Sequence, residues 1–300
     1  YGRALKKFNT IEKFFYDIYD DQFDFHTYSI RKATMRTYID LVRMEDRLRA
    51  HPFYFRAAVE AVKWHVFAFD KKITDEKQKT DEMSQMSESE RKKALRKAKK
   101  AELAKGDSKD DVTKSSGSLV ASANANTKDG KKKDDDPDGS KLLSEGDLLT
   151  QSLKFLKPLL ELSPGRIESQ ILGVSVYLRR KNYLLAAKAL KNGYKIDPSN
   201  PELHKLAVEL ATAVNADSAI NEKVKPIVLE GLQSVLQGQD LKAFNESFGK
   251  KHSTDSILHA ASFAETSAIV GGDVSAAVDI VVSVSSREGV KKMFNVEVRI

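Results

Sequence analysis

The chain has 300 residues, of which 41% are apolar and 31% are charged, and it contains no cysteine. The apolar content is sufficient for a sizeable core, while the lack of cysteine excludes a disulfide framework and a thiolate zinc site. A chain without cysteine fits a reducing compartment, the cytosol or the nucleus. The formal net charge of +7 is unevenly distributed along the chain. The most apolar segments, 256–272 and 274–286, are too short to span a bilayer, so we expect no membrane-spanning segment.

The first 70 residues predict a set of helices. Tyr1, Ala4, Phe8 and Ile11 are spaced three or four residues apart, which marks one face of a helix and fits the second helix of a tetratricopeptide repeat. The first helix of that repeat is missing, so we expect the chain to be a piece of a longer helical solenoid that lacks the N-terminal repeats. The helices predicted in this part cover about residues 1–18, 26–49 and 52–69.

The character of the sequence changes at residue 71. Residues 107–139 are rich in serine, glycine, asparagine and charge, which predicts disorder. Ser87-Glu-Ser-Glu90 is a capping box, so a lone basic helix is predicted at about 87–105. The predicted organisation is helical repeats at 1–70, a charged linker at 71–141 and C-terminal helical repeats at 142–300.

The predicted basic helix carries a dense block of positive charge. Its candidate RNA-binding residues are Arg91, Lys92, Lys93, Arg96, Lys97, Lys99 and Lys100. Such a block favours RNA through the release of counterions. A solvated charged helix without a partner explains the same residues.

Residues 173–198 match the tetratricopeptide pattern better than any other part of the chain. The residues at the signature spacing are Tyr177, Tyr183, Ala186, Leu190 and Pro198, and Gly193 replaces the usual alanine. A turn follows, and a helix restarts at Pro201. Further helices are predicted at about 202–215, 221–237, 240–249, 253–270, 273–285 and 287–294.

The predicted fold class is all-α: a tetratricopeptide-like α-solenoid of helix pairs, interrupted by a charged, partly disordered linker with one basic helix. On β-propensity alone, the run Val278–Val284 could be a strand. Its helical neighbours and the helical spacing of Ala276, Ile280 and Val284 favour a helix.

Two motifs have the residue types of a catalytic or metal site. Gln170–Ser175 is close to the acetyl-CoA loop of GNAT acetyltransferases, in which backbone N–H groups at a strand-to-helix junction hold a pyrophosphate. No strand is predicted before it, and Gly173 falls inside a predicted helix, so helix packing is the favoured interpretation. The other motif is a carboxylate–histidine cluster of Asp20, Asp21, Asp24 and His26, which helix capping and solvation explain without a metal. We predict no catalytic residue and no metal site.

Paired basic residues on the first two predicted helices are a stronger candidate for binding. The five residues are Lys6, Lys7, Arg31, Lys32 and Arg36. If the two groups face each other across the short loop, they form a pocket for a multiply phosphorylated small molecule, held by charge-assisted hydrogen bonds. Ordinary surface bases paired with nearby carboxylates are the alternative.

A series of motifs along the first 70 residues has a specific order and spacing. These motifs are Asp20–Tyr28, Arg31-Lys32, Leu41, Glu45-Asp46, Leu48-Arg49, His51–Phe55 and Ala57-Ala58. Together with the basic helix, the run Lys131–Asp136, Leu153–Pro158 and Phe244–Phe248, they resemble the auxiliary subunit of the N-terminal acetyltransferase A (NatA) complex. The resemblance covers nearly the whole chain and is looser in its last third.

The resemblance implies a non-catalytic scaffold that wraps a GNAT catalytic subunit and tethers it to the ribosome, through rRNA, for co-translational N-terminal acetylation. It implies a cytoplasmic complex in which only the partner binds acetyl-CoA, and a small huntingtin-interacting regulatory protein as a further candidate partner. It also implies inositol hexakisphosphate as a structural cofactor, with the five basic residues named above as its candidates. The alternatives are a tetratricopeptide adaptor that clamps a peptide terminus and an RNA-binding solenoid with no enzyme partner.

Overall fold

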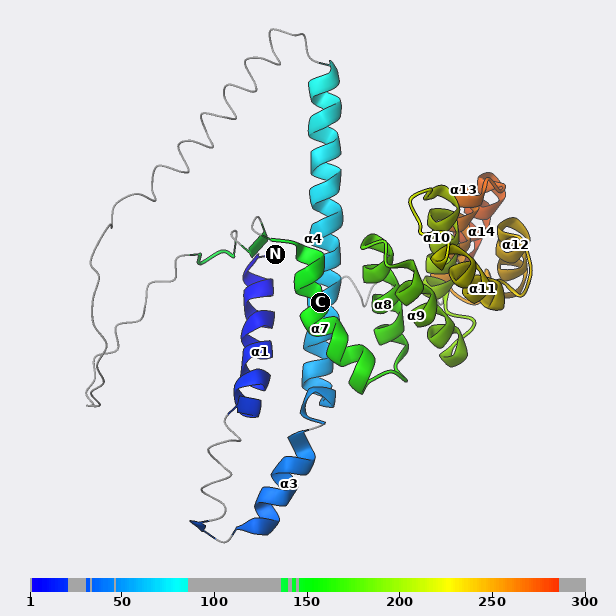
Figure 1. The fold of residues 1–300 in the computed structure, drawn as a ribbon. Coiled ribbons are helices and arrows are strands. Elements are labelled where there is room, and N and C mark those ends of the chain that lie inside the picture. Colours follow the sequence, from blue (N-terminus) through cyan, green and yellow to red (C-terminus); the bar gives the residue numbers. More distant parts are fainter. Residues whose placement is uncertain are drawn as a thin grey trace. The chain divides into compact units, whose positions relative to one another are not determined.

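The structure is a computed structural model that describes residues 2–20, 31–32, 34–45, 47–85, 136–139, 142–143 and 146–285. Across these residues the regular elements are helices, and none of them is a strand (Figure 1). The predicted all-α solenoid class is therefore confirmed. In the described part, no helix combines the length and apolarity that crossing a membrane requires. The predicted helices at 87–105 and 287–294 lie outside the described residues, as does most of 107–139.

Two compact units divide the chain: Tyr1–Ala68 together with Gly139–Ile300, and Phe69–Asp138. Helix α4 (Pro52–Gln85) begins in the first unit and continues into the second. All the other helices described below belong to the first unit.

The N-terminal part of the first unit contains α1 (Gly2–Asp20), α3 (Met35–Glu45) and the short 3-10 helix η1 (Leu48–Ala50). The prediction of one helix over 26–49 is wrong. Thr34 is not helical, and its carbonyl accepts the N–H of Tyr38 at 3.1 Å, so a new helix starts there. At the other end, His51 precedes a proline and is extended, as the steric restriction on that position requires.

Helix α4 begins at Pro52, as predicted, and the Nδ1 atom of His51 accepts the N–H of Phe53 at 3.2 Å. The predicted end at residue 69 is wrong, because the helix continues to Gln85. The apolar stripe stops near Phe69, but the following residues are largely Lys, Glu, Gln and Asp without glycine or proline. Lysine, glutamate and glutamine lose little rotamer freedom in a helix. The helix therefore continues beyond the end of its apolar face.

Over the described residues 146–285, the C-terminal part is a series of eight helices. They are α7 (Leu148–Leu162), α8 (Ile167–Arg179), α9 (Tyr183–Ile196), α10 (Pro201–Ala216), α11 (Val224–Leu236), α12 (Leu241–His252), α13 (Ile257–Val270) and α14 (Val274–Ser285). Side-chain caps at Asp147, Asn200, Asp240 and Ser256 start four of them. The helical interpretation of Val278–Val284 is confirmed, as are the other helices predicted between 202 and 285.

Two buried clusters hold these helices together. One joins the first part of α4 to α7 and α8, with Phe8 and Phe15 of α1 packed against it; the Phe15 ring meets the Tyr54 ring edge-on at 5.0 Å. The other joins α8, α9, α10 and α11. Tyr177 on α8 packs against both clusters, so the predicted tetratricopeptide pair α8–α9 connects them.

Candidate functional site

The turn between α9 and α10 is held by its own side chains. Asp197 accepts the backbone N–H of Ser199 at 3.0 Å and the Ser199 hydroxyl at 2.7 Å. These bonds, the hydroxyl bond first, lower the pKa of the Asp197 carboxyl. The side chain of Asn200 then caps α10 by accepting the N–H groups of Glu202 and Leu203. The turn thereby presents fixed backbone carbonyls to the helix that packs on it.

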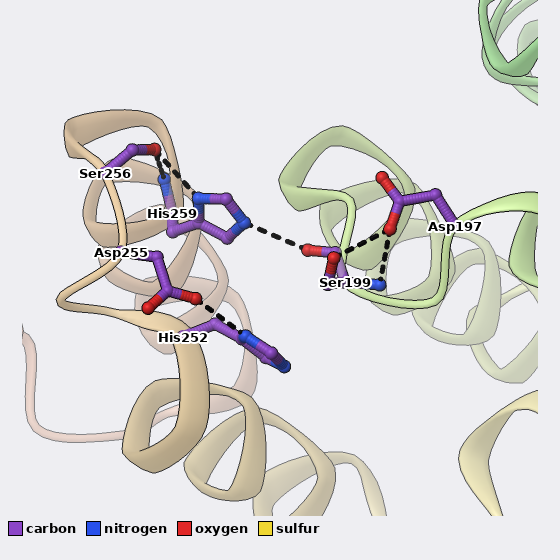
Figure 2. A network of polar contacts seen from close by, with 6 residues as sticks. All are labelled: Asp197, Ser199, His252, Asp255, Ser256 and His259. Atoms are coloured by element: carbon purple, nitrogen blue, oxygen red, sulfur yellow. Dashed lines mark hydrogen bonds and ion pairs between the residues drawn. The ribbon is translucent and has the colours of Figure 1, made fainter.

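Helix α13 contacts this turn, and Figure 2 shows the contact between His259 and Ser199. His259 Nε2 lies 3.1 Å from the Ser199 carbonyl oxygen, and the Ser262 hydroxyl donates to the Pro201 carbonyl at 2.6 Å. A carbonyl only accepts, so Nε2 of His259 carries a proton, and Nδ1 lies 2.8 Å from the Ser256 hydroxyl oxygen. The imidazole of His259 thus joins two residues, Ser199 and His259, that are 60 positions apart in the chain.

A buried polar network lies beneath this contact. His204 of α10 is fully buried, and its ring stacks on that of Phe248 with centroids 3.8 Å apart. Its Nε2 atom lies 2.9 Å from Asn245 Oδ1, which also lies 2.6 Å from the Thr266 hydroxyl. Asn245 donates through Nδ2 to the Ser267 hydroxyl at 2.9 Å. The network therefore joins α10, α12 and α13.

Burial lowers the pKa of His204 to about 4, and the bond to Asn245 opposes this shift. The ring is therefore neutral at pH 7. The motif Phe244–Phe248, noted in the sequence, supplies both aromatic rings that stack on it, and Asn245 lies between them in the chain. This network was not predicted from the sequence. The signal that could have indicated it is His204, a polar residue on an otherwise apolar face of α10.

The structure places three of the predicted phosphate-binding residues on described helices. Lys6 is half-buried and Lys7 exposed on α1, and Arg36 is exposed on α3. Arg31 and Lys32 are exposed just before α3. Residues 21–30, which join the two groups, lie outside the described residues, so the shared pocket stays a prediction. One nearby carboxylate, Glu12, pairs with Arg49 of η1 at 3.5 Å.

The other predicted binding residues fall mostly outside the described part of the chain. This is true of all seven basic residues between Arg91 and Lys100, and of Asp21, Asp24 and His26. Asp20 is the last residue of α1. Within the described ranges, no group of three or more His, Cys, Asp or Glu side chains is arranged to hold a metal ion.

The segment Gln170–Ser175 lies inside helix α8, so no strand-to-helix loop exists there. A Cβ atom on Gly173 would lie 3.2 Å from a methyl carbon of Leu160 and 3.3 Å from the Cβ of Ala189. Glycine is therefore used for close packing between helices. The interpretation of this motif as helix packing rather than an acetyl-CoA loop is confirmed.

The described residues thus form a helical solenoid whose polar networks join helix to helix, and proteins of this class use extended surfaces for binding. Comparison with known protein families assigns the chain to one family within this class. The model of the family "N-terminal acetyltransferase A, auxiliary subunit" matches residues 1–193. The chain belongs to this family.

Relatives from distant organisms support the same assignment. The human protein "N-alpha-acetyltransferase 16, NatA auxiliary subunit" is 34% identical over 266 residues, which are 86% of this chain and 30% of the human protein. The Arabidopsis thaliana "N-terminal acetyltransferase A complex auxiliary subunit NAA15" is 34% identical over 273 residues, 88% of this chain and 30% of that protein. The chain therefore spans about 30% of the length of these relatives.

A solved structure also resembles this chain. It is the "Structure of Naa15/Naa10 bound to HypK-THB", which matches with a TM-score of 0.54 and 31% sequence identity. The similarity covers 78% of this chain and 26% of the chain in that structure.

Proposed function

We propose that this chain is part of a non-catalytic scaffold subunit that wraps the GNAT catalytic subunit of a NatA complex. The observation that carries the proposal is the family match over residues 1–193, joined by relatives that are named auxiliary subunits. The similar solved structure contains Naa15 and Naa10 bound to HypK-THB. By analogy, the partners of this chain are a GNAT catalytic subunit and a small huntingtin-interacting regulatory protein.

The physical properties of the solenoid suit this role. Each helix pair of a solenoid packs mainly on its neighbours, so a long surface stays available to a second protein. The one segment that resembled an acetyl-CoA loop is a packed helix. Acetyl-CoA is therefore assigned to the catalytic partner.

The test is an acetyl-CoA assay. The purified chain is expected neither to bind acetyl-CoA in calorimetry nor to transfer acetyl groups to a peptide N-terminus. The full-length protein co-expressed with a GNAT catalytic subunit is expected to do both. Turnover by the chain alone, retained through two orthogonal purification steps, contradicts the proposal.

The proposal also includes an inositol hexakisphosphate site and a ribosome contact. The five basic residues Lys6, Lys7, Arg31, Lys32 and Arg36 supply the charge for the first, and all of them except Lys6 are exposed. The block Arg91–Lys100 supplies the charge for rRNA binding. A ribosome contact places the complex in the cytoplasm.

A further inference from the structure

The exposed side of helix α9 carries positive charge alone. The helix contains three lysines and neither aspartate nor glutamate. Lys188, Lys191 and Lys195 are all exposed, and none of them has an ion-pair partner in the described part of the chain. Their spacing of three and four residues places them in one row along the helix, and Leu184 continues this lysine row one turn earlier. Like charges at these spacings repel and destabilise a helix, so solvation alone is a poor reason for the row.

Large apolar side chains are exposed at both ends of the lysine row. Leu184 and Leu185 are 47% and 43% exposed at its N-terminal end, and Ile196 is 40% exposed at its C-terminal end. The two leucines line a cavity of about 460 Å³ together with Ile220 and Val224. This volume lies within the range of pockets that hold small ligands, so it has room for an apolar side chain. Contiguous apolar surface next to charged residues is typical of protein-binding sites.

The carboxylate at this cavity is already paired. Asp217 is the one acidic residue among the described residues that line the cavity. It accepts the Tyr183 hydroxyl at 2.8 Å and the Ala219 N–H at 2.9 Å, and the Lys181 Nζ atom lies 3.6 Å from it. The acidic residues of α8, α10 and α11, which pack against α9, form no ion pair with the lysine row. The row is therefore available to the carboxylates of another molecule.

We propose that this surface of α9 binds an amphipathic acidic helix of a partner protein. Carboxylates spaced three and four residues apart on the incoming helix pair with the lysine row, since both helices repeat their side chains with the same period. An apolar side chain one turn beyond the last carboxylate enters the cavity beside Leu184. The spacing from Leu184 through the row to Lys195 is four, three and four residues. This order is the same in both directions, so the incoming helix can run parallel or antiparallel to α9.

A helix fits this surface better than an extended peptide or RNA. The N–H and C=O groups of α9 bond within the helix, so an extended segment finds no backbone partner there, whereas a helix satisfies its own groups. RNA phosphates could pair with the lysines, but the exposed ends of the row are aliphatic and give a base no aromatic ring for stacking. The inference does not depend on the catalytic partner, so it can fail while the scaffold function holds.

The test is fluorescence polarisation of the full chain with a labelled helical peptide, Ala-Ala-Glu-Ala-Ala-Gln-Glu-Ala-Ala-Glu-Ala-Gln-Leu-Leu-Ala-Ala. Its glutamates and leucines have the proposed spacing. Lys188→Glu with Lys191→Glu is expected to weaken binding about tenfold. Lys250→Glu with Lys251→Glu is the matched control, because it makes the same charge change on exposed residues of α12. In about 0.15 M salt remote charges are screened, so its effect is expected to stay within about twofold.

Two altered peptides test the apolar contact and the spacing. Alanine in place of both leucines is expected to weaken binding about tenfold, because the cavity is left without its side chain. Moving the three glutamates to different sides of the helix, at the same composition, is expected to weaken binding about fivefold. Circular dichroism melting verifies that each protein variant is folded.

The proposal has clear contrary outcomes. It is overturned if the two lysine double variants weaken binding alike, or if either altered peptide binds as well as the original. Absence of binding at millimolar peptide also overturns it. Tighter binding of a single-stranded RNA, lost in the Lys188→Glu with Lys191→Glu variant, shows that the surface binds nucleic acid instead.

Discussion

The buried imidazole of His204 makes the stability of the C-terminal helices depend on pH. Burial lowers its pKa from 6.5 to about 4. Because the folded pKa lies below the unfolded one, the unfolded chain binds more protons between these values, and stability falls as the pH falls. Between pH 7 and pH 5 this residue alone removes about 2 kcal/mol from the free energy of unfolding.

His204→Gln removes the titration and keeps a donor. The side-chain amide of glutamine can take the place of the imidazole Nε2–H and donate to Asn245 Oδ1. The variant is expected to be less stable at pH 7, since it loses the stacking on Phe248. Its free energy of unfolding is expected to fall by about 2 kcal/mol less than that of the wild type between pH 7 and pH 5.

The measurement is urea unfolding followed by circular dichroism at pH 7, 6 and 5. The single tryptophan, Trp64, lies on α4 and does not report on the network. Asp147, Asp197 and Asp217 have lowered pKa values, so their contribution is lost only as the pH falls below their usual value of 3.8. His65, whose pKa burial also lowers, is present in both proteins. Equal pH dependence of the two proteins refutes the reasoning.

Four further outcomes are expected. Arg31→Glu with Lys32→Glu should abolish inositol hexakisphosphate binding in calorimetry and the rise in Tm that the ligand gives. Replacing the seven basic residues between 91 and 100 by glutamate should weaken ribosome cosedimentation, with a smaller salt slope, while the solenoid stays folded. Gly193→Ala should cost about 1–2 kcal/mol in urea unfolding, because the new Cβ would lie 2.8 Å from a methyl carbon of the buried Leu203. Gly231→Ala, at an ordinary 3.6 Å contact, should instead stabilise by about 0.5–1 kcal/mol.

These outcomes are compared with control variants and with the results that would contradict them. Lys250→Glu with Lys251→Glu, two exposed residues on α12, makes the same charge change away from the predicted phosphate site. Unchanged inositol phosphate affinity in the first double variant, or equal loss in the control, places the site elsewhere. Undiminished cosedimentation means that the basic block does not bind the ribosome. Equal effects of the two glycine substitutions contradict the packing argument.

Helix positions were predictable where local chemistry sets them. Pro52 and Pro201 open helices because the first turn needs no N–H from proline, and the spacing of Tyr177, Tyr183 and Ala186 identifies the α8–α9 pair. Predictions that relied on the apolar stripe alone were less accurate. The end of α4 was predicted too early, because residues of high helix propensity continue beyond the apolar stripe.

The polar networks were not predictable because their partners are distant in the chain. His204 and Asn245 are 41 residues apart, and Ser199 and His259 are 60 apart. Spacing rules concern neighbours within a few turns, so they could flag His204 as polar on an apolar face but could not name its partner. The predicted phosphate site has the same difficulty, since it depends on how two helices approach each other.

The central claim is tested most directly by copurification of the full-length protein that contains this chain. The protein is affinity-purified from its own cells, and its partners are quantified by mass spectrometry. A GNAT acetyltransferase subunit is expected in stoichiometric amount, together with N-terminal acetyltransferase activity in the eluate. An eluate that lacks any GNAT subunit contradicts the account and favours an adaptor or an RNA-binding solenoid.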